Sequence, residues 1–163
     1  KGFSYLIAAL EMLDIPWRAT IAGRAHSNAP PILGEFLARE NVRYLGHTPH
    51  ENLLEEMTNS HLFVFPSLVE GFAMVLTEAM AAGLPILTTP HTAAPDLITN
   101  GVEGVIVPIR DPEAMANEIT ALFEDEPRRS SMSAAAIKLM KSISWWNYRR
   151  AILDAVVNRP ALS

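Results

Sequence analysis

Residues 66–86 read PSLVEGFAMVLTEAMAAGLPI, and this stretch decides both the fold and the candidate site. A short apolar run at residues 61–65 comes directly before it, which predicts a buried strand. Residues 72–82 are apolar almost all round, which predicts a buried helix. A second apolar run at residues 84–88 predicts another strand. Strand, helix and strand in this order are typical of a parallel α/β unit.

The rest of the chain alternates in the same way between expected strands and expected helices. Further strands are expected over residues 17–22, 42–45 and 102–107. Further helices are expected over residues 3–13, 31–39, 49–57, 94–99, 112–123, 128–140 and 145–157. Because the apolar runs at 61–65 and 84–88 do not alternate with polar residues, their strands are buried on both faces. We therefore expect a Rossmann-like, doubly wound parallel sheet with helices on both faces.

Two further expectations concern the ends of elements. Thr48 stands before the expected helix at 49–57 and is predicted to cap it, with Glu51 three residues later. The chain opens with a helix, whereas a doubly wound sheet normally opens with a strand. We therefore expect a first strand to precede Lys1.

Composition limits the classes of function. The chain has 163 residues, of which 49% are hydrophobic and 19% charged, as in an ordinary globular domain. Its net charge of −5 gives no electrostatic reason to expect nucleic acid as a partner. The absence of cysteine excludes disulfides, cysteine zinc sites and thiol nucleophiles. The five histidines are scattered without the spacing of metal ligands, so no metal site is expected.

One carboxylate precedes the apolar helix of the quoted stretch and a second lies within it. Glu70 follows a strand, where open α/β sheets bind ligands, and Gly71 lets a ligand approach the backbone. Glu78 is the only charged residue of the helix, and a buried carboxylate needs a partner or a polar cleft. Eight residues of helix would separate the two glutamates by about 12 Å. With anion-binding N–H groups between them, this spacing suits a ligand with hydroxyls at both ends and phosphates in the middle.

The full pattern resembles a known enzyme family. Glu70 and Glu78 lie within EGF-x-x-V-x-x-EAMA-x-G-x-P. Further matching residues follow in order along the chain: Lys1-Gly2, Val42-x-x-Leu45-Gly46, Pro66-Ser67, Asn100-Gly101 and Ser144-Trp145. This set resembles the retaining glycosyltransferases of the GT-B fold, group-one type (family four). The resemblance implies that residues 1–163 form the C-terminal, nucleotide-sugar-binding domain of a two-domain enzyme whose N-terminal acceptor domain is absent.

The same resemblance implies roles for individual residues. Glu70 is the expected catalytic residue, close to the anomeric carbon of the transferred sugar, and Glu78 is expected to accept hydrogen bonds from the ribose. Backbone groups are expected to hold sugar hydroxyls and phosphate at Phe72, Ala73, Met74 and Val75. The other expected donor-binding residues are Lys1 at the diphosphate, His47 and Thr48 in the loop lining the base, Gly23 and Gly71. No metal or other cofactor is expected, since protein cations would cover the phosphates and the chain has no Asp-x-Asp pair.

Two departures from the family pattern and several simpler interpretations stay open. Ala73 stands where the family often has glycine, and Gly23-Arg24-Ala25 stands where it often has Gly-x-Gly. Glu70 could only complement the helix dipole, Glu78 could only face solvent, Lys1 could be a flexible terminal residue, and Gly23 could be a plain turn. Another GT-B enzyme (an epimerase or a phosphorylase) and a non-catalytic binding or assembly module are the alternatives. A dinucleotide-dependent oxidoreductase is disfavoured because no GxGxxG follows a strand.

The expected partners follow from this reading. They are a nucleotide sugar, an acceptor that is a glycan, a lipid-linked sugar or a small polyol, and the N-terminal domain. Arg128-Arg129 and Arg149-Arg150 are interpreted as solvated helix faces, with contact to anionic lipid as the alternative. A cytoplasmic location is expected, with peripheral membrane association of the full-length protein as the alternative.

Overall fold

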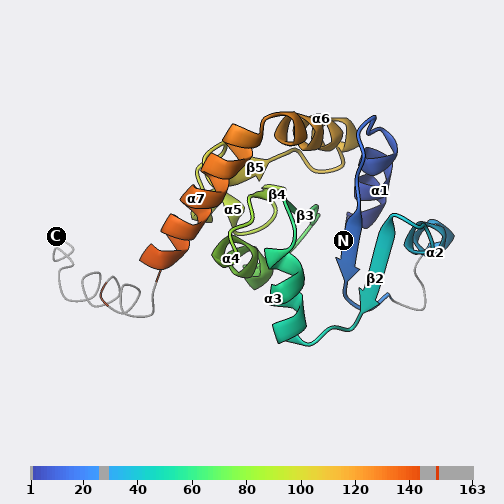
Figure 1. Ribbon diagram of the computed structural model, residues 1–163, viewed down its shortest axis with the longest axis horizontal. Helices are drawn as coiled ribbons and strands as arrows, with labels where there is room; N and C mark the ends of the chain where they lie inside the picture. Colours follow the sequence, from blue (N-terminus) through green and yellow to red (C-terminus); the bar gives the residue numbers. More distant parts are fainter. Residues whose placement is uncertain (1, 26–29, 144–149, 151–163) are drawn as a thin grey trace, which may run out of the picture.

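The structure is a computed structural model that describes residues 2–25, 30–143 and 150 (Figure 1). Its strands are β1 (Ala19–Ala22), β2 (Val42–Gly46), β3 (Phe63–Phe65), β4 (Ile86–Thr88) and β5 (Gly104–Ile106). Its helices are α1 (Phe3–Glu11), α2 (Pro31–Leu37), α3 (His50–Thr58), α4 (Met74–Ala81), α5 (Ala94–Leu97), α6 (Pro112–Glu124) and α7 (Glu126–Ser142). Each expected element up to residue 140 is present. The expected helix at 145–157 and Lys1 lie outside the described residues.

All strand pairs are parallel, as expected, but the strands form two sheets instead of one. β1 pairs with β2, and β3, β4 and β5 pair in that order. Figure 1 shows the two sheets beside each other, with β1 and β3 as the neighbouring edges. A doubly wound sheet of strand order 3-2-1-4-5-6 has its first strand at this place, between the second and the fourth. The strand expected before Lys1 stays a prediction.

The start of the chain lies beside the end of β3. Gly2 has φ +72°, and a Cβ built on it would stand 1.7 Å from the carbonyl oxygen of Pro66. Only glycine avoids both the strained backbone and this clash. The chain therefore enters α1 from the carboxyl end of β3.

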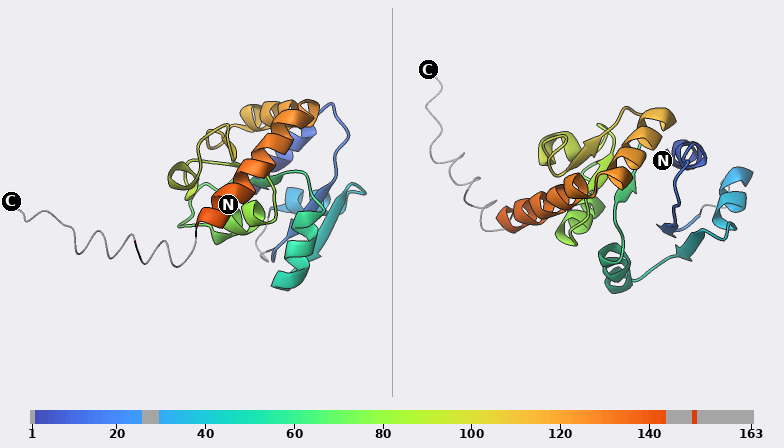
Figure 2. Two further views of the ribbon diagram at one scale, coloured as in Figure 1. Left: turned by 60° about the vertical axis from the view of Figure 1, so that its left-hand side comes forward. Right: turned by 45° about the horizontal axis from the view of Figure 1, so that its top comes forward.

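Helices cover both faces of the β3-β4-β5 sheet, and alternate strand residues contribute to two cores. One core contains Leu87 and Val105 with side chains of α1 and α6, and Val64 packs against it. The other contains Ile86 with side chains of α4, α5 and α7, and Phe63 packs against it. Figure 2 shows α6 beside α1 and α7 beside α4. This two-sided burial is why the strands read as continuous apolar runs.

Side-chain caps set the starts of two helices, α6 and α7. Asp111 and Asp125 accept hydrogen bonds from the backbone N–H groups of Ala114 and Arg128, both at 2.9 Å, and so cap α6 and α7. The Asp125 cap makes α7 begin at Glu126, two residues before the expected start. The prediction that Thr48 caps α3 is wrong. Pro49 holds the cap position, and the Thr48 hydroxyl turns back to the carbonyl of Gly46 at 3.4 Å.

Candidate functional site at the carboxyl edge of the strands

Glu70 lies in the loop that joins β3 to α4. Its backbone N–H donates to the carbonyl of His91 at 3.1 Å, and its Oε1 accepts from the N–H of Gly71 at 3.3 Å. The side chain is partly exposed. Three neighbours in this loop and the first turn of α4 carry exposed apolar side chains, namely Val69, Phe72 and Met74. The backbone of Glu70 is thus held by a hydrogen bond, while the side chains around it are accessible to solvent.

The helix that follows begins later than expected because of Ala73. This residue takes a left-handed conformation (φ 58°, ψ 63°) as the N-cap of α4, so the helix starts at Met74 and not at Phe72. Among the described residues, no side chain caps this helix, and the N–H of Leu76 is satisfied by the Ala73 carbonyl at 2.9 Å. First-turn N–H groups of a helix have no intrahelical partner. Those of Met74 and Val75 are therefore suited to an anion or a hydroxyl.

Glu78 lies one turn further along α4 and faces α3. Its side chain is 28% exposed, and its Oε1 is 3.9 Å from Nδ1 of His50, the first residue of α3. At this distance the pair is an electrostatic contact and not a hydrogen bond. The carboxylate therefore reaches solvent from the helix whose buried face carries Leu76, Ala79 and Met80.

The second part of the site lies at the ends of β1 and β2. The N–H of Gly23 donates to the carbonyl of Gly46 at 2.7 Å, so the two expected loops are adjacent. The hydroxyl of Tyr44 donates to the carbonyl of Gly23 at 3.0 Å and accepts from the N–H of Ala25 at 3.1 Å. A Cβ on Gly23 would meet nothing within 4 Å, and φ is +126° there. The positive φ of Gly23 favours glycine, and the space that a Cβ would occupy is open.

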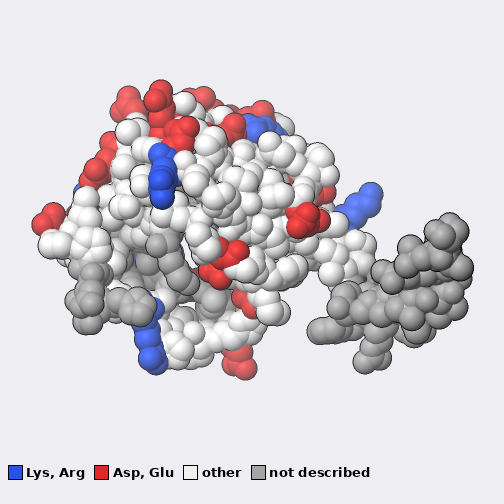
Figure 3. Space-filling view, turned by 180° about the vertical axis from the view of Figure 1, so that it is seen from behind, with Lys and Arg blue, Asp and Glu red and all other residues white. Residues whose placement is uncertain are grey.

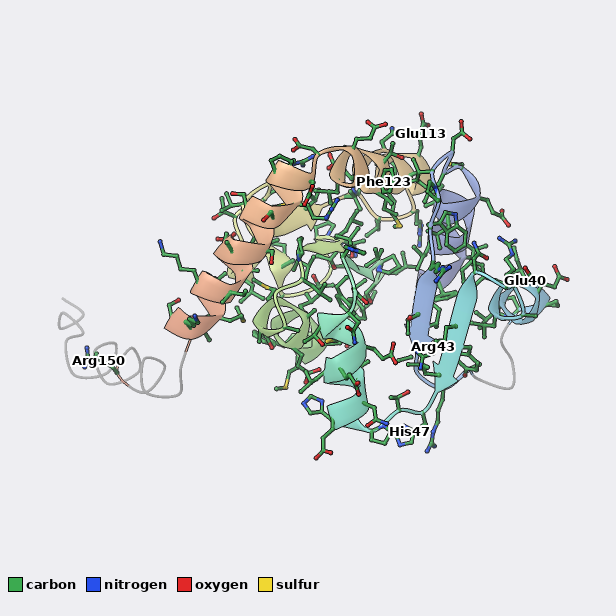
Figure 4. The ribbon with its side chains drawn as sticks, in the orientation of Figure 1. Glu40, Arg43, His47, Glu113, Phe123 and Arg150 are labelled. Atoms are coloured by element: carbon green, nitrogen blue, oxygen red, sulfur yellow. The ribbon has the colours of Figure 1, made fainter. Side chains whose placement is uncertain are left out.

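The remaining sequence-predicted positions are placed as follows. His47 is exposed in the turn between β2 and α3, and Thr48 is partly buried there (Figure 4). Arg43 of β2 forms an ion pair with Glu56 of α3 at 2.8 Å, which ties this turn to α3. Glu70, Gly23 and the His47 turn follow the carboxyl ends of β3, β1 and β2, and Glu78 lies on the helix that follows the Glu70 loop. The structure does not describe Lys1.

A cavity of about 190 Å³ lies elsewhere in the molecule. Its lining includes His61, Gly83 and Arg129, from segments that precede β3 and β4 and from the start of α7. It therefore belongs to the amino ends of the strands, away from both glutamates.

Two residues of the site were missed from the sequence. Tyr44 bridges the Gly23 loop, and His91 contacts the Glu70 loop from the segment between β4 and α5. Both contacts span about twenty residues of sequence or more, so no local pattern reveals them. The one signal was positional, since Tyr44 lies within β2 and His91 lies three residues after the end of β4.

Charge and metal-ligating groups add little on the described surface. Acidic residues gather along the upper edge of the face in Figure 3, while Lys and Arg stand apart from one another. Glu113, on α6, is labelled at this edge in Figure 4. Over residues 2–25, 30–143 and 150, no group of three His, Asp or Glu side chains could hold a metal ion. No helix within the same ranges is both long and apolar enough to cross a membrane.

Comparison with known proteins gives consistent findings. The family model described as "Glycosyl transferases group 1" matches residues 1–139. D-inositol 3-phosphate glycosyltransferase of Corynebacterium aurimucosum is 31% identical over 89% of this chain and 37% of its own length. O-antigen chain mannosyltransferase B of Escherichia coli is 30% identical over 70% of this chain and 29% of its own length. The chain thus spans well under half of these relatives.

Among solved structures, Anabaena Alr3699/HepE in complex with UDP-glucose matches with a TM-score of 0.81 and 21% identity. The match covers 98% of this chain and 46% of that one. A likeness at this identity shows the fold, and it confirms the expected Rossmann-like α/β architecture.

Proposed function

The chain belongs to the glycosyl transferases of group 1, and from this we propose that it supplies the donor site of a GT-B sugar transferase. The proposed donor is a nucleoside-diphosphate sugar. The proposed acceptor is a hydroxyl of a glycan, a lipid-linked sugar or a small polyol. Because the chain spans well under half of its relatives, the acceptor site is assigned to a second, N-terminal domain. On that basis the chain alone binds donor weakly and transfers nothing.

One observation carries the proposal. Glu70 and Glu78 lie on either side of the start of α4, and no described side chain caps the helix between them. A sugar at Glu70, phosphates at the N–H groups of the first turn and a ribose at Glu78 match this order of groups. The exposed turn at His47 is next to α3, whose first residue contacts Glu78, and so it suits the base.

The proposed chemistry needs stabilisation of charge more than acid–base groups. The bond between the anomeric carbon and the diphosphate oxygen breaks, and a bond from the acceptor oxygen to the same carbon forms on the same face. The acceptor proton passes to the departing diphosphate. Helix N–H groups and Lys1 stabilise the negative charge on the diphosphate. Glu70 orients the sugar and stabilises its developing positive charge, and no metal is needed.

The test is a calorimetric titration of the complete enzyme with UDP, GDP and UDP-glucose. Glu78→Ala is expected to weaken binding of the preferred nucleotide about tenfold, because hydrogen bonds to a charged group are lost. Glu70→Ala is expected to leave nucleotide affinity within about twofold and to reduce sugar transfer by the complete enzyme about a hundredfold. Glu113→Ala removes an exposed carboxylate on α6 and serves as the matched control. Binding and transfer at the parental level in both site variants would overturn the assignment.

A non-catalytic module of the same fold is the second candidate. The left-handed alanine at position 73, where the family often has glycine, is the observation that favours it. Nucleotide binding without transfer by the complete protein would support this alternative.

A further inference from the structure

Side chains at the end of β4 and directly after it contact three carbonyl groups at the end of β3 and in the loop that follows. Thr88 Oγ1 donates to the carbonyl of Phe65 at 2.8 Å, and Thr89 Oγ1 donates to that of Ser67. His91 Nδ1 lies 2.7 Å from the carbonyl oxygen of Leu68. Thr88 and Thr89 are fully buried, so their hydroxyls are committed to these bonds. The contacts continue the β3–β4 pairing beyond the strands, as far as Glu70.

His91 differs from the two threonines because it contacts the loop on both sides of position 69. Its ring meets the carbonyl of Leu68, and its own carbonyl accepts the N–H of Glu70 at 3.1 Å. A carbonyl oxygen can only accept, so Nδ1 must carry the proton. This bond fixes the ring tautomer and leaves Nε2 without a proton in the neutral ring.

We propose that His91 is a positioning residue for Glu70, acting through its Nδ1–H bond to Leu68 and its backbone bond to Glu70. The part of this inference that concerns sugar transfer rests on the proposed function. His91 does not need to touch the donor. It holds the backbone of residues 68–70 in place, while the imidazole ring of His91 is exposed. Misplacement of a group at a reacting centre by about 1 Å can lower a rate a hundredfold, so a clamp of this kind affects transfer more than binding.

The experiment compares His91→Ala, His91→Asn and His91→Gln, with His61→Ala as the matched control. The Asn side-chain nitrogen takes the place of Nδ1, whereas that of Gln takes the place of Nε2. His61 is an exposed histidine before β3, at the opposite end of that strand. Hydrogen exchange of the Glu70 amide and ¹⁵N NMR of the imidazole are measured on the protein without ligand.

In the parent protein we expect the Nδ1–H tautomer at His91 and a protected Glu70 amide. His91→Ala and His91→Gln should speed exchange of this amide about fivefold, because the loop loses one hydrogen bond. His91→Asn should restore parental exchange, and His61→Ala should change nothing at Glu70. Parental exchange in His91→Ala, or the Nε2–H tautomer in the parent, would overturn the proposal. Equal loss in His91→Asn and His91→Ala would also overturn it.

Binding and transfer separate this inference from the proposed function. His91→Ala should bind UDP within about twofold of the parent, while kcat for transfer by the complete enzyme falls about tenfold and is rescued by His91→Asn. If the parent binds neither UDP, GDP nor UDP-glucose, the proposed function fails. The exchange and tautomer measurements still decide whether His91 holds Glu70.

Discussion

Replacing Ala73 by glycine tests the backbone geometry of the site most directly. Ala73 has φ 58° and ψ 63°, a left-handed conformation that costs an L-residue with a Cβ about 1–2 kcal/mol. Glycine removes this strain but gives the unfolded chain more freedom, which costs about 0.4–1 kcal/mol. Ala73→Gly is therefore expected to stabilise the protein by about 0.5–1 kcal/mol. This corresponds to a rise in melting temperature of about 2–3 °C at this chain length.

The assay is urea unfolding, with the midpoint compared at constant slope. Arg110, with φ 59°, is the other non-glycine residue of the described chain in this conformation, so Arg110→Gly should shift the midpoint in the same direction. Ala134 is exposed within the right-handed helix α7, and Ala134→Gly should destabilise by about 1 kcal/mol. If Ala73→Gly lowers the midpoint as Ala134→Gly does, the left-handed start of α4 does not exist in solution.

Two other substitutions test the packing and the caps. Gly104→Ala would place a Cβ 2.3 Å from the carbonyl oxygen of Ile86 and force β4 and β5 apart, so it should destabilise by about 1–3 kcal/mol in urea unfolding. Gly34→Ala, where a Cβ meets nothing within 4 Å, should not destabilise, and the reverse order of these two variants would contradict the packing. Asp111→Ala removes the cap of α6 and should cost about 1 kcal/mol, while Asp111→Asn should keep most of the stability; equal losses would refute the capping role.

The order and type of the elements could be predicted from the sequence because strands that are buried on both faces consist of continuous apolar runs. The residues at which the elements begin and end could not be predicted in this way. The run at 61–65 keeps ladder bonds only from Phe63 onward, where its N–H meets the carbonyl of Pro85. The helix expected from Phe72 begins at Met74 because Ala73 is left-handed. Alanine is a strong helix former, so nothing in the local sequence reveals this conformation. The division into two sheets is likewise a property of which edges pair, and periodicity does not record it.

The candidate site was predictable where it depends on spacing along one element and not where it depends on contacts between loops. Glu70 lies in a loop and Glu78 in the helix that follows it, so their spacing can be predicted from their separation along the sequence. His91 and Tyr44 act through bonds to carbonyl groups 23 and 21 residues away. Such bonds are satisfied by tertiary geometry alone, since any polar side chain at the right place could make them.

The two missed residues have the same physical function, and this connects the two halves of the site. Tyr44 holds the carbonyl of Gly23, and His91 holds that of Leu68, each from a neighbouring parallel segment. A loop that offers its N–H groups to a ligand cannot use them for its own structure, so its position must be maintained through its carbonyls and through side chains from outside. Recognition by backbone groups therefore requires this kind of support. A search for site residues in such a fold should include the polar side chains that bond to the carbonyls of the binding loops.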